Sequence, residues 1–167
     1  MSKDSSKQWS TRTDRLVGRL LVAFEDLRPG LRHAVHLEIR NEGFDPVAVI
    51  NQPKISCEVY DVSGTPVPTL ESSANGPRQV RQWCVIPTDA YAGIRVDAQT
   101  GSVPTRQQGM VLLAIGGRRW GLKPGTYLLK ASAVFNSDED GPANQWVGEL
   151  QLPPVEVVVT QEMVATD

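Results

Sequence analysis

The chain has 167 residues, of which 40% are hydrophobic and 22% charged, with a formal net charge of −2 and an isoelectric point near 5.7. This length fits one domain with a substantial core, and the small net charge gives no electrostatic basis for binding nucleic acid or an anionic membrane. No apolar run approaches the roughly 20 residues that a membrane-spanning helix needs. We therefore expect a globular domain without a nucleic-acid partner or a membrane span.

Both ends of the sequence are expected to be loosely held. Residues 1–14 contain basic and small residues but no apolar segment of the kind a signal peptide carries, so we interpret them as a flexible leader. Residues 161–167 are expected to fray, which leaves residues 15–160 as a single folded domain. As written, the chain is expected in the cytoplasm. The alternative is an exported protein whose signal peptide is not part of this sequence.

Strands dominate the expected secondary structure. No stretch combines a sustained 3.6-residue period with helix caps, and twelve prolines and fourteen glycines punctuate the chain. Alternation is clearest over residues 33–41, where Val35, Leu37 and Ile39 share one face and polar residues occupy the other. The other strands expected in the first part of the chain cover residues 15–24, 47–50, 55–59, 79–86 and 94–98.

The second part of the chain contains a longer alternating stretch. Residues 127–135 place Tyr, Leu, Ala, Ala and Phe on one face of an expected strand. Residues 110–115 are apolar on both faces, which predicts a central strand or one covered on its outer side, and residues 118–119, two arginines, are interpreted as a solvated turn. The prolines at 153–154 cannot donate ladder hydrogen bonds. They predict a break between two strands, over residues 146–152 and 155–160.

Roughly eight to ten short strands, with turns about every 8–12 residues, are typical of an all-β sandwich. The sequence LKPGTY at Leu122–Tyr127 resembles the turn and tyrosine that begin a late strand in immunoglobulin-like domains. The expected hairpin at Asp61–Pro66 and the segment Trp146–Leu150 are similar to bacterial immunoglobulin-like domains, many of unknown function, and distantly to intracellular proteinase inhibitors of this sandwich type. The resemblance implies an immunoglobulin-like antiparallel β-sandwich with a tyrosine corner at Pro124, Gly125 and Tyr127.

The residue inventory gives little support to catalysis, so we expect neither enzymatic activity nor a cofactor. His33 and His36 lie three residues apart on an expected strand, so their side chains leave opposite faces and cannot share one site. Nucleophile-elbow and nucleotide-binding motifs are missing. The rival hypothesis is an enzyme with a pocket beside Asp89, Asp97 or Asp138.

The two cysteines and the acidic loop at residues 136–145 each allow two interpretations. Cys57 and Cys84 are interpreted as buried small hydrophobes, with a disulfide as the alternative. In the loop, three side chains offer oxygen ligands at alternate positions ahead of a glycine, as in the first half of a calcium loop, but the position of the bidentate glutamate is a valine. We expect a solvated loop without metal. A calcium site is the less favoured alternative, at Asn136, Asp138 and Asp140.

We expect a non-catalytic protein-binding or accessory module that engages an unidentified protein through end loops or an edge strand. The loops at residues 66–77, 99–108 and 136–145 are the candidate surfaces. The residues expected to contact the partner are Asp138, Glu139, Asn144, Arg106, Gln107 and Trp146. A proteinase inhibitor is a specific form of this hypothesis and predicts one rigid loop in an extended conformation.

Two alternatives from other classes stay open. A carbohydrate-binding module would use exposed tryptophans as stacking platforms, with Trp83, Trp120 and Trp146 as candidates, although a core position is favoured for each. A structural subunit would cover the apolar strands at residues 110–115 and 127–135 with a second copy. The sequence does not predict the oligomeric state.

Overall fold

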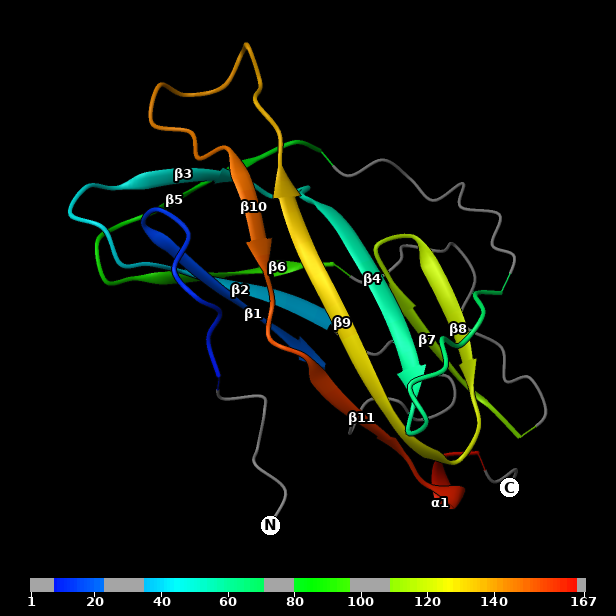
Figure 1. The fold of residues 1–167 in the computed structure, drawn as a ribbon. Coiled ribbons are helices and arrows are strands. Elements are labelled where there is room, and N and C mark those ends of the chain that lie inside the picture. The colour runs from blue at the N-terminus through cyan, green and yellow to red at the C-terminus, as the bar shows by residue number, and fades with distance from the viewer. Residues whose placement is uncertain (1–7, 23–34, 71–79, 97–108, 165–167) are drawn as a thin grey trace.

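The computed structural model describes residues 8–22, 35–70, 80–96 and 109–164. Over these ranges the fold is all-β, with eleven strands and one short helix (Figure 1). The elements are β1 (Leu16–Val22), β2 (Val35–Asn41), β3 (Val47–Ile50), β4 (Lys54–Asp61), β5 (Trp83–Ile86), β6 (Tyr91–Arg95), β7 (Val111–Ile115), β8 (Arg118–Leu122), β9 (Gly125–Phe135), β10 (Gly148–Gln151), β11 (Val155–Val159) and α1 (Gln161–Val164).

The described strands pair in four antiparallel sheets: β1–β2–β6, β3–β5, β7–β8, and a sheet centred on β9. β4 pairs with β9 along Tyr127–Val134 and occupies one edge. β10 and β11 share the other edge in series, because β10 pairs with Ser132–Phe135 and β11 with Gly125–Leu129. In Figure 1 the sheet of β4, β9, β10 and β11 lies in front of β1, β2 and β6.

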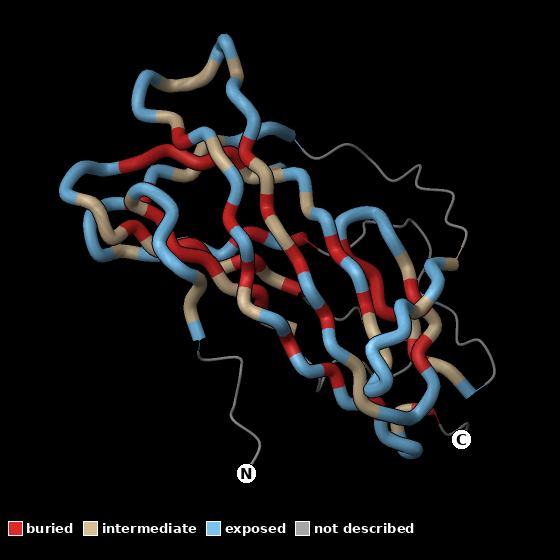
Figure 2. Tube along the Cα trace, viewed as in Figure 1, coloured by how far each residue is buried: buried red, intermediate tan, exposed pale blue. Residues whose placement is uncertain are grey.

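A single cluster of buried apolar side chains contains residues from every described strand and from α1. Trp120 and Phe135 are its largest fully buried members, and the Phe135 ring meets Trp146 edge-to-face with the ring centroids 5.4 Å apart. The two layers approach closely at Gly18 of β1, where an added Cβ would lie 3.0 Å from the Leu152 side chain. Figure 2 shows buried and exposed positions alternating along β9, as expected for a strand with one face on the core.

Ten of the eleven strands correspond to stretches expected from the sequence. On β2 the predicted inner face is confirmed, since Val35, Leu37 and Ile39 are fully buried. The predicted alternation on β9 is confirmed over Leu129–Phe135. The predicted break at residues 153–154 is also confirmed, because β10 ends at Gln151 and β11 begins at Val155.

Two expectations about strands were wrong, and a third was met by its second alternative. Arg118 and Arg119 do not form a solvated turn but begin β8, whose Trp120 and Leu122 are buried while the arginines occupy the outer positions. The stretch at 110–115 was expected to be a central strand or one covered on its outer side. Among the described residues β7 pairs with β8 alone, so it is not central, but its outer side is covered, with Ala114 only 5% exposed. β6 begins at residue 91, three residues before the expected start.

The described parts of the two ends contact the rest of the fold at several points. The Ser10 amide donates to the Gly18 carbonyl at 2.9 Å, and the Gly18 amide donates to Ser10 Oγ at 2.9 Å, so this part of the expected leader lies along β1. The Arg19 guanidinium lies 4.5 Å from the Trp9 ring centroid. At the other end α1 lies within the segment expected to fray, and its Val164 is buried against the core. Residues 1–7 and 165–167 lie outside the described residues.

Candidate functional site

The acidic loop between β9 and β10, residues 136–145, is closed by its own hydrogen bonds. The Gln145 side chain accepts from the Asp138 amide at 2.9 Å and donates to the Asp138 carbonyl at 2.8 Å. The Gly141 amide also donates to the Asp138 carbonyl at 3.0 Å. At the base, the Ala48 amide of β3 donates to the Asn144 carbonyl at 3.0 Å. The loop is therefore a compact series of turns and not the extended segment that the proteinase-inhibitor hypothesis predicts.

Asp138, the first of the expected partner contacts, is engaged within the fold. Its Oδ1 accepts from the Asp140 amide at 3.1 Å, and its Oδ2 accepts from Arg81 Nη1 at 2.9 Å. The Asp138 side chain is only 18% exposed, whereas that of Arg81 is 70% exposed. This carboxylate fixes the loop to the segment that precedes β5, so it is poorly placed to receive a partner.

The other expected contacts divide between surface and core. Glu139 and Asn144 are exposed, although Asn144 Nδ2 also donates to the Pro46 carbonyl at 3.3 Å. Trp146 is only 6% exposed because its ring packs in the core, so the ring does not reach the surface where a partner contact was expected. Arg106 and Gln107 lie outside the described residues, as do residues 71–79 and 97–108 of the two other candidate loops.

The three residues of the possible calcium site do not converge with other acidic groups. Asn136 and Asp140 are exposed, and the Asp138 carboxylate is bound to a backbone amide and a guanidinium. Across residues 8–22, 35–70, 80–96 and 109–164, no three His, Cys, Asp or Glu side chains lie close enough to hold a metal ion.

The tryptophans considered as sugar platforms are tied into the protein. Trp120 and Trp146 are 1% and 6% exposed, as the favoured core interpretation predicts. Trp83 is half-buried and supports the acidic loop, since a Cβ added at Gly141 would lie 2.7 Å from its Cζ2 atom. The Trp120 and Trp146 rings therefore present no open face of the kind that stacks on a sugar.

The cysteines are both free thiols, so the disulfide alternative was wrong. Cys57 on β4 is buried, as expected, and burial raises the pKa of its thiol to about 12. Cys84 on β5 is half-buried. Of the groups considered for catalysis, His36 is half-buried on the outer face of β2 and Asp89 is an exposed turn residue, whereas His33 and Asp97 lie outside the described residues.

Tyr127 forms the hydrogen bond expected of a tyrosine corner. Its hydroxyl donates to the Lys123 carbonyl at 2.9 Å, across the turn that contains Pro124 and Gly125. Gly125 has φ of 156°, and a Cβ added there would lie 3.8 Å from the Tyr127 ring. The hydrogen bond ties the connection between β8 and β9 to the start of β9.

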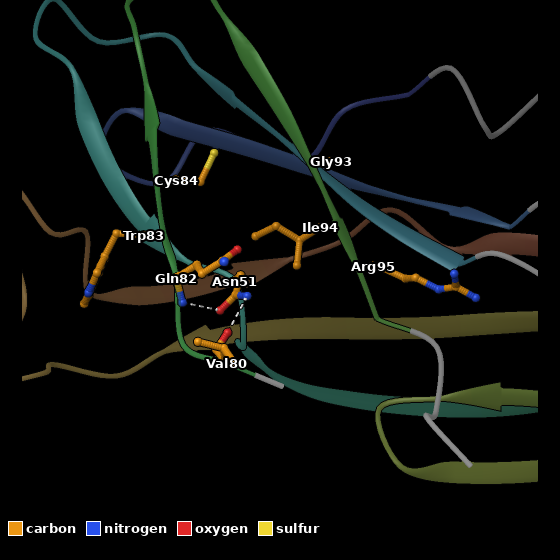
Figure 3. Close-up of a pocket in the computed structure, with 8 residues that line it drawn as sticks. All are labelled: Asn51, Val80, Gln82, Trp83, Cys84, Gly93, Ile94 and Arg95. Carbon is orange, nitrogen blue, oxygen red and sulfur yellow. Dashed lines mark hydrogen bonds between the residues drawn. The ribbon is translucent and has the colours of Figure 1, made fainter. Parts of the chain in front are cut away.

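A hollow of about 580 Å³ lies between β5 and β6 (Figure 3). Its lining comes from β5, β6 and the segments beside them: Asn51, Val80, Gln82, Trp83, Cys84, Gly93, Ile94 and Arg95. One rim is fixed by Asn51, whose side chain accepts from the Gln82 amide at 3.0 Å and donates to the Val80 carbonyl at 3.1 Å. Figure 3 shows Ile94 pointing from β6 toward β5 and Trp83 pointing away from the hollow.

The backbone edges beside this hollow are open within the described residues. β5 pairs with β3 and β6 pairs with β2, and each is the last strand of its sheet. The Asn51 amide donates to the Gln82 carbonyl, so the backbone amide and carbonyl groups of residues 82, 84 and 86 point toward β3. Because these groups alternate in direction along an antiparallel strand, those of Trp83 and Val85 point away from β3. On β6 the same alternation turns Tyr91 and Gly93 away from β2. The two strands are joined by a short turn, at which the Ala90 amide donates to the Pro87 carbonyl at 3.1 Å.

Comparison with known proteins leaves this geometry as the basis for any assignment. No protein-family model, curated protein or solved structure matches this chain. In the part of the chain that the structure describes, no helix has the length and apolar character needed to cross a membrane.

The hollow was not identified from the sequence, which directed attention to the loops. Its walls depend on the pairing of β2 with β6 and of β3 with β5. The paired residues are 33 positions apart in the sequence for Ile50 and Trp83 and 59 positions apart for His36 and Arg95. One local signal was present. Gly93 lies inside a strand without an obvious turn, and such a glycine often marks close approach of another backbone.

Proposed function

We propose that this chain is a non-catalytic protein-binding module on an immunoglobulin-like β-sandwich, and that it binds its partner at the hollow between β5 and β6. The observation that carries the proposal is the divergence of two successive strands, each with an open backbone edge, around a hollow of about 580 Å³. An exposed strand edge is a template for pairing with another chain, and proteins that lack such a function usually protect it.

Two features support the immunoglobulin-like interpretation of the fold. The bond from the Tyr127 hydroxyl to the Lys123 carbonyl matches the tyrosine corner of that family. The sheet centred on β9 and the sheet β1–β2–β6 contribute to a single apolar cluster, with β10 against β1 at Gly18. A shared apolar core and close contact between the two sheets are what a two-layer sandwich requires.

Exposed apolar side chains support the choice of surface. Val80, Val85 and Tyr91 are 76%, 57% and 67% exposed, and they lie on the hollow's lining or within two residues of it. Clustered apolar exposure is more typical of an interaction site than of free surface. The hydrogen bonds of Asn51 hold one rim in place, so a partner would meet a preformed surface.

The chemistry of the lining supports a binding role rather than catalysis. Cys84 is its only nucleophile, and none of the lining residues is an imidazole or a carboxylate that could activate the thiol. Arg95 is the only charged residue among them. The lining can form hydrogen bonds and apolar contacts.

Site-specific photocrosslinking in cells of the source organism tests this function. A photoreactive phenylalanine analogue replaces Val85 or Tyr91 in the proposed surface, and Leu128 or Val158 as matched controls, which are 37% and 43% exposed on the sheet of β9. We expect the same discrete protein adduct from the first two positions and not from the controls. Adducts formed equally at all four positions, or at none, would contradict the proposal. An adduct with a second copy of the chain would instead favour the self-associating structural subunit.

A further inference from the structure

We infer that Phe44, at the tip of the connection between β2 and β3, enters an apolar pocket on a partner protein whose pocket rim carries lysine or arginine. Phe44 is 97% exposed, the highest value among the exposed large hydrophobic residues of the described chain. In Figure 1 this connection and the turn between β5 and β6 lie side by side at one end of the molecule. The surface contains none of the residues that line the hollow, so the inference goes beyond the proposed function.

The turn that carries Phe44 is fixed by a side chain in the protein interior. Asn41 is fully buried, and its side chain accepts from the Gly43 amide at 2.9 Å and donates to the Asp45 carbonyl at 2.9 Å. These two bonds lie on either side of Phe44 in the sequence, so they hold the backbone from which the ring projects. A ring presented on a preformed turn binds at a lower entropic cost than one on a turn that binding must order.

Neighbouring segments support the same turn. The Glu42 amide donates to the Arg15 carbonyl at 2.7 Å. A Cβ added at Gly43 would lie 2.7 Å from the Arg15 Cβ, so any larger residue would force the chain before β1 to move. The Asp89 amide donates to the Asn41 carbonyl at 2.9 Å, which joins the turn between β5 and β6 to the base of this connection. The tip is therefore held by two other segments of the chain.

The stability of the fold does not account for a phenylalanine at this position. A side chain stabilises the folded state through the apolar area that folding removes from water, and folding removes almost none from Phe44. Isolated exposed apolar residues are common on protein surfaces. Phe44 differs from the exposed valines because its ring is larger and its turn is fixed by a buried side chain. Aromatic rings of this kind are enriched where proteins bind one another.

The charges around the exposed ring indicate the chemistry of the partner. Glu42 and Asp45 lie within two residues of the ring in the sequence, and Asp89 lies in the neighbouring turn. Within the described parts of the chain, none of these three carboxylates forms an ion pair, whereas the adjacent Arg15 is paired with Asp14 at 3.4 Å. The tip therefore carries an excess of negative charge. Such a surface repels anionic lipid and nucleic acid and complements a basic protein surface.

A displayed library of domain-sized fragments of the source organism's proteins is the probe for this inference. The library is selected on the purified full chain, and each enriched fragment is produced and titrated by calorimetry. Phe44→Ser removes the ring. Val62→Ser is the matched control, because Val62 is 82% exposed in another turn that an aspartate side chain holds. Glu42→Gln combined with Asp45→Asn removes two of the negative charges without removing the ring.

We expect an enriched fragment with a basic surface whose affinity falls about thirtyfold or more with Phe44→Ser. Val62→Ser should leave this affinity unchanged. The double charge variant should lower the association rate and weaken its dependence on salt. Because Phe44 packs against little of its own chain, Phe44→Ser should keep the melting temperature of the wild type. ¹⁵N relaxation should give the Phe44 amide the same order as the amides of β2, and a mobile turn would contradict the inference.

The binding measurements can also overturn the inference. It fails if no enriched fragment depends on Phe44, or if the dependent fragments are acidic. It fails as well if Phe44→Ser abolishes binding to phosphatidylcholine vesicles or self-association in ultracentrifugation, because the ring then meets lipid or a second copy. If crosslinks at Val85 and Tyr91 form in any of these cases, the proposed function stands and the role of Phe44 alone fails.

Discussion

Asn41 is the one polar residue among the fully buried side chains of the described chain, and its replacement by alanine should destabilise the fold strongly. Its Nδ2 donates to the Asp45 carbonyl at 2.9 Å and to the Ile86 carbonyl at 3.0 Å, and its Oδ1 accepts from the Gly43 amide at 2.9 Å. These bonds fasten the end of β2 to the connection that follows it and to the end of β5. Asn41→Ala would remove all three.

The cost of Asn41→Ala can be worked from the surroundings of each partner. The Ile86 carbonyl is buried, so leaving it without a donor should cost about 1–2 kcal/mol. The Gly43 amide and the Asp45 carbonyl are partly accessible to water, so each lost bond should cost about 0.5–1 kcal/mol. The total is about 3 kcal/mol, or a fall in Tm of roughly 6–12 °C for a protein of this size.

Guanidinium unfolding followed by circular dichroism measures this difference, with Asn51→Ala as the matched control. Asn51 also bonds backbone groups through both ends of its amide, to the Val80 carbonyl and the Gln82 amide, but these bonds are exposed. Asn51→Ala should therefore cost under about 1 kcal/mol. Equal costs for the two variants, or a loss below about 1 kcal/mol for Asn41→Ala, would refute the assignment of stability to buried hydrogen bonds.

Asn41→Asp tests the same argument through pH. A carboxylate keeps the acceptor for the Gly43 amide but faces the carbonyls of Asp45 and Ile86, which it cannot serve while ionised. Its pKa should be higher in the folded state than in the unfolded state, so the variant should lose stability as pH rises above about 4 and regain it in acid. A flat difference from wild type between pH 4 and pH 7 would contradict this.

The remaining predictions concern the tyrosine corner, the buried thiol and the acidic loop. Tyr127→Phe removes the bond to the Lys123 carbonyl and should lower the free energy of unfolding by about 1 kcal/mol in urea titrations. Burial raises the pKa of the Cys57 thiol to about 12, so the unfolded state loses this proton at lower pH than the folded state. The free energy of unfolding should therefore fall by up to about 1.4 kcal/mol per pH unit above pH 9, and Cys57→Ala should flatten that slope. Asp138→Ala removes the cap on the loop and its ion pair with Arg81, and limited proteolysis within residues 136–145 should accelerate several-fold, with unchanged cleavage contradicting the role of this carboxylate.

Sequence reasoning succeeded where side chains alternate and failed where a strand's identity depends on distant partners. The alternation on β2 and β9 reports burial on one face, which is a local property of the sequence. β8 was missed because two adjacent arginines suggested a turn, although Trp120 and Leu122 already alternated after them. Arg118 also donates through Nη1 to the Cys57 carbonyl at 3.3 Å, a contact over 61 residues that no local pattern reveals.

The candidate site could not be predicted because it too depends on contacts between residues that are distant in the sequence. The sequence predicted contact residues on the acidic loop, but Asp138 and Trp146 are used by the fold itself, through a carboxylate bound to Arg81 and a buried ring. The hollow between β5 and β6 arises because two strands that follow each other join different partners, β3 and β2. Sequence periodicity reports which face of a strand is buried, and it does not report which edge is left open.

The position of β9 in the chain has a consequence for the order of folding. This strand pairs with β4, β10 and β11, yet it follows β4 by more than sixty residues, so Lys54 meets its partner Val134 only after eighty further residues have been added. Pairs within the segment from β9 to β11 are closer, such as Phe135 with Gly148. During synthesis β4 must therefore wait, with an unpaired edge, for β9 to leave the ribosome. The segment from β9 to β11 should form first and then recruit the earlier strands, because short loops close at lower entropic cost.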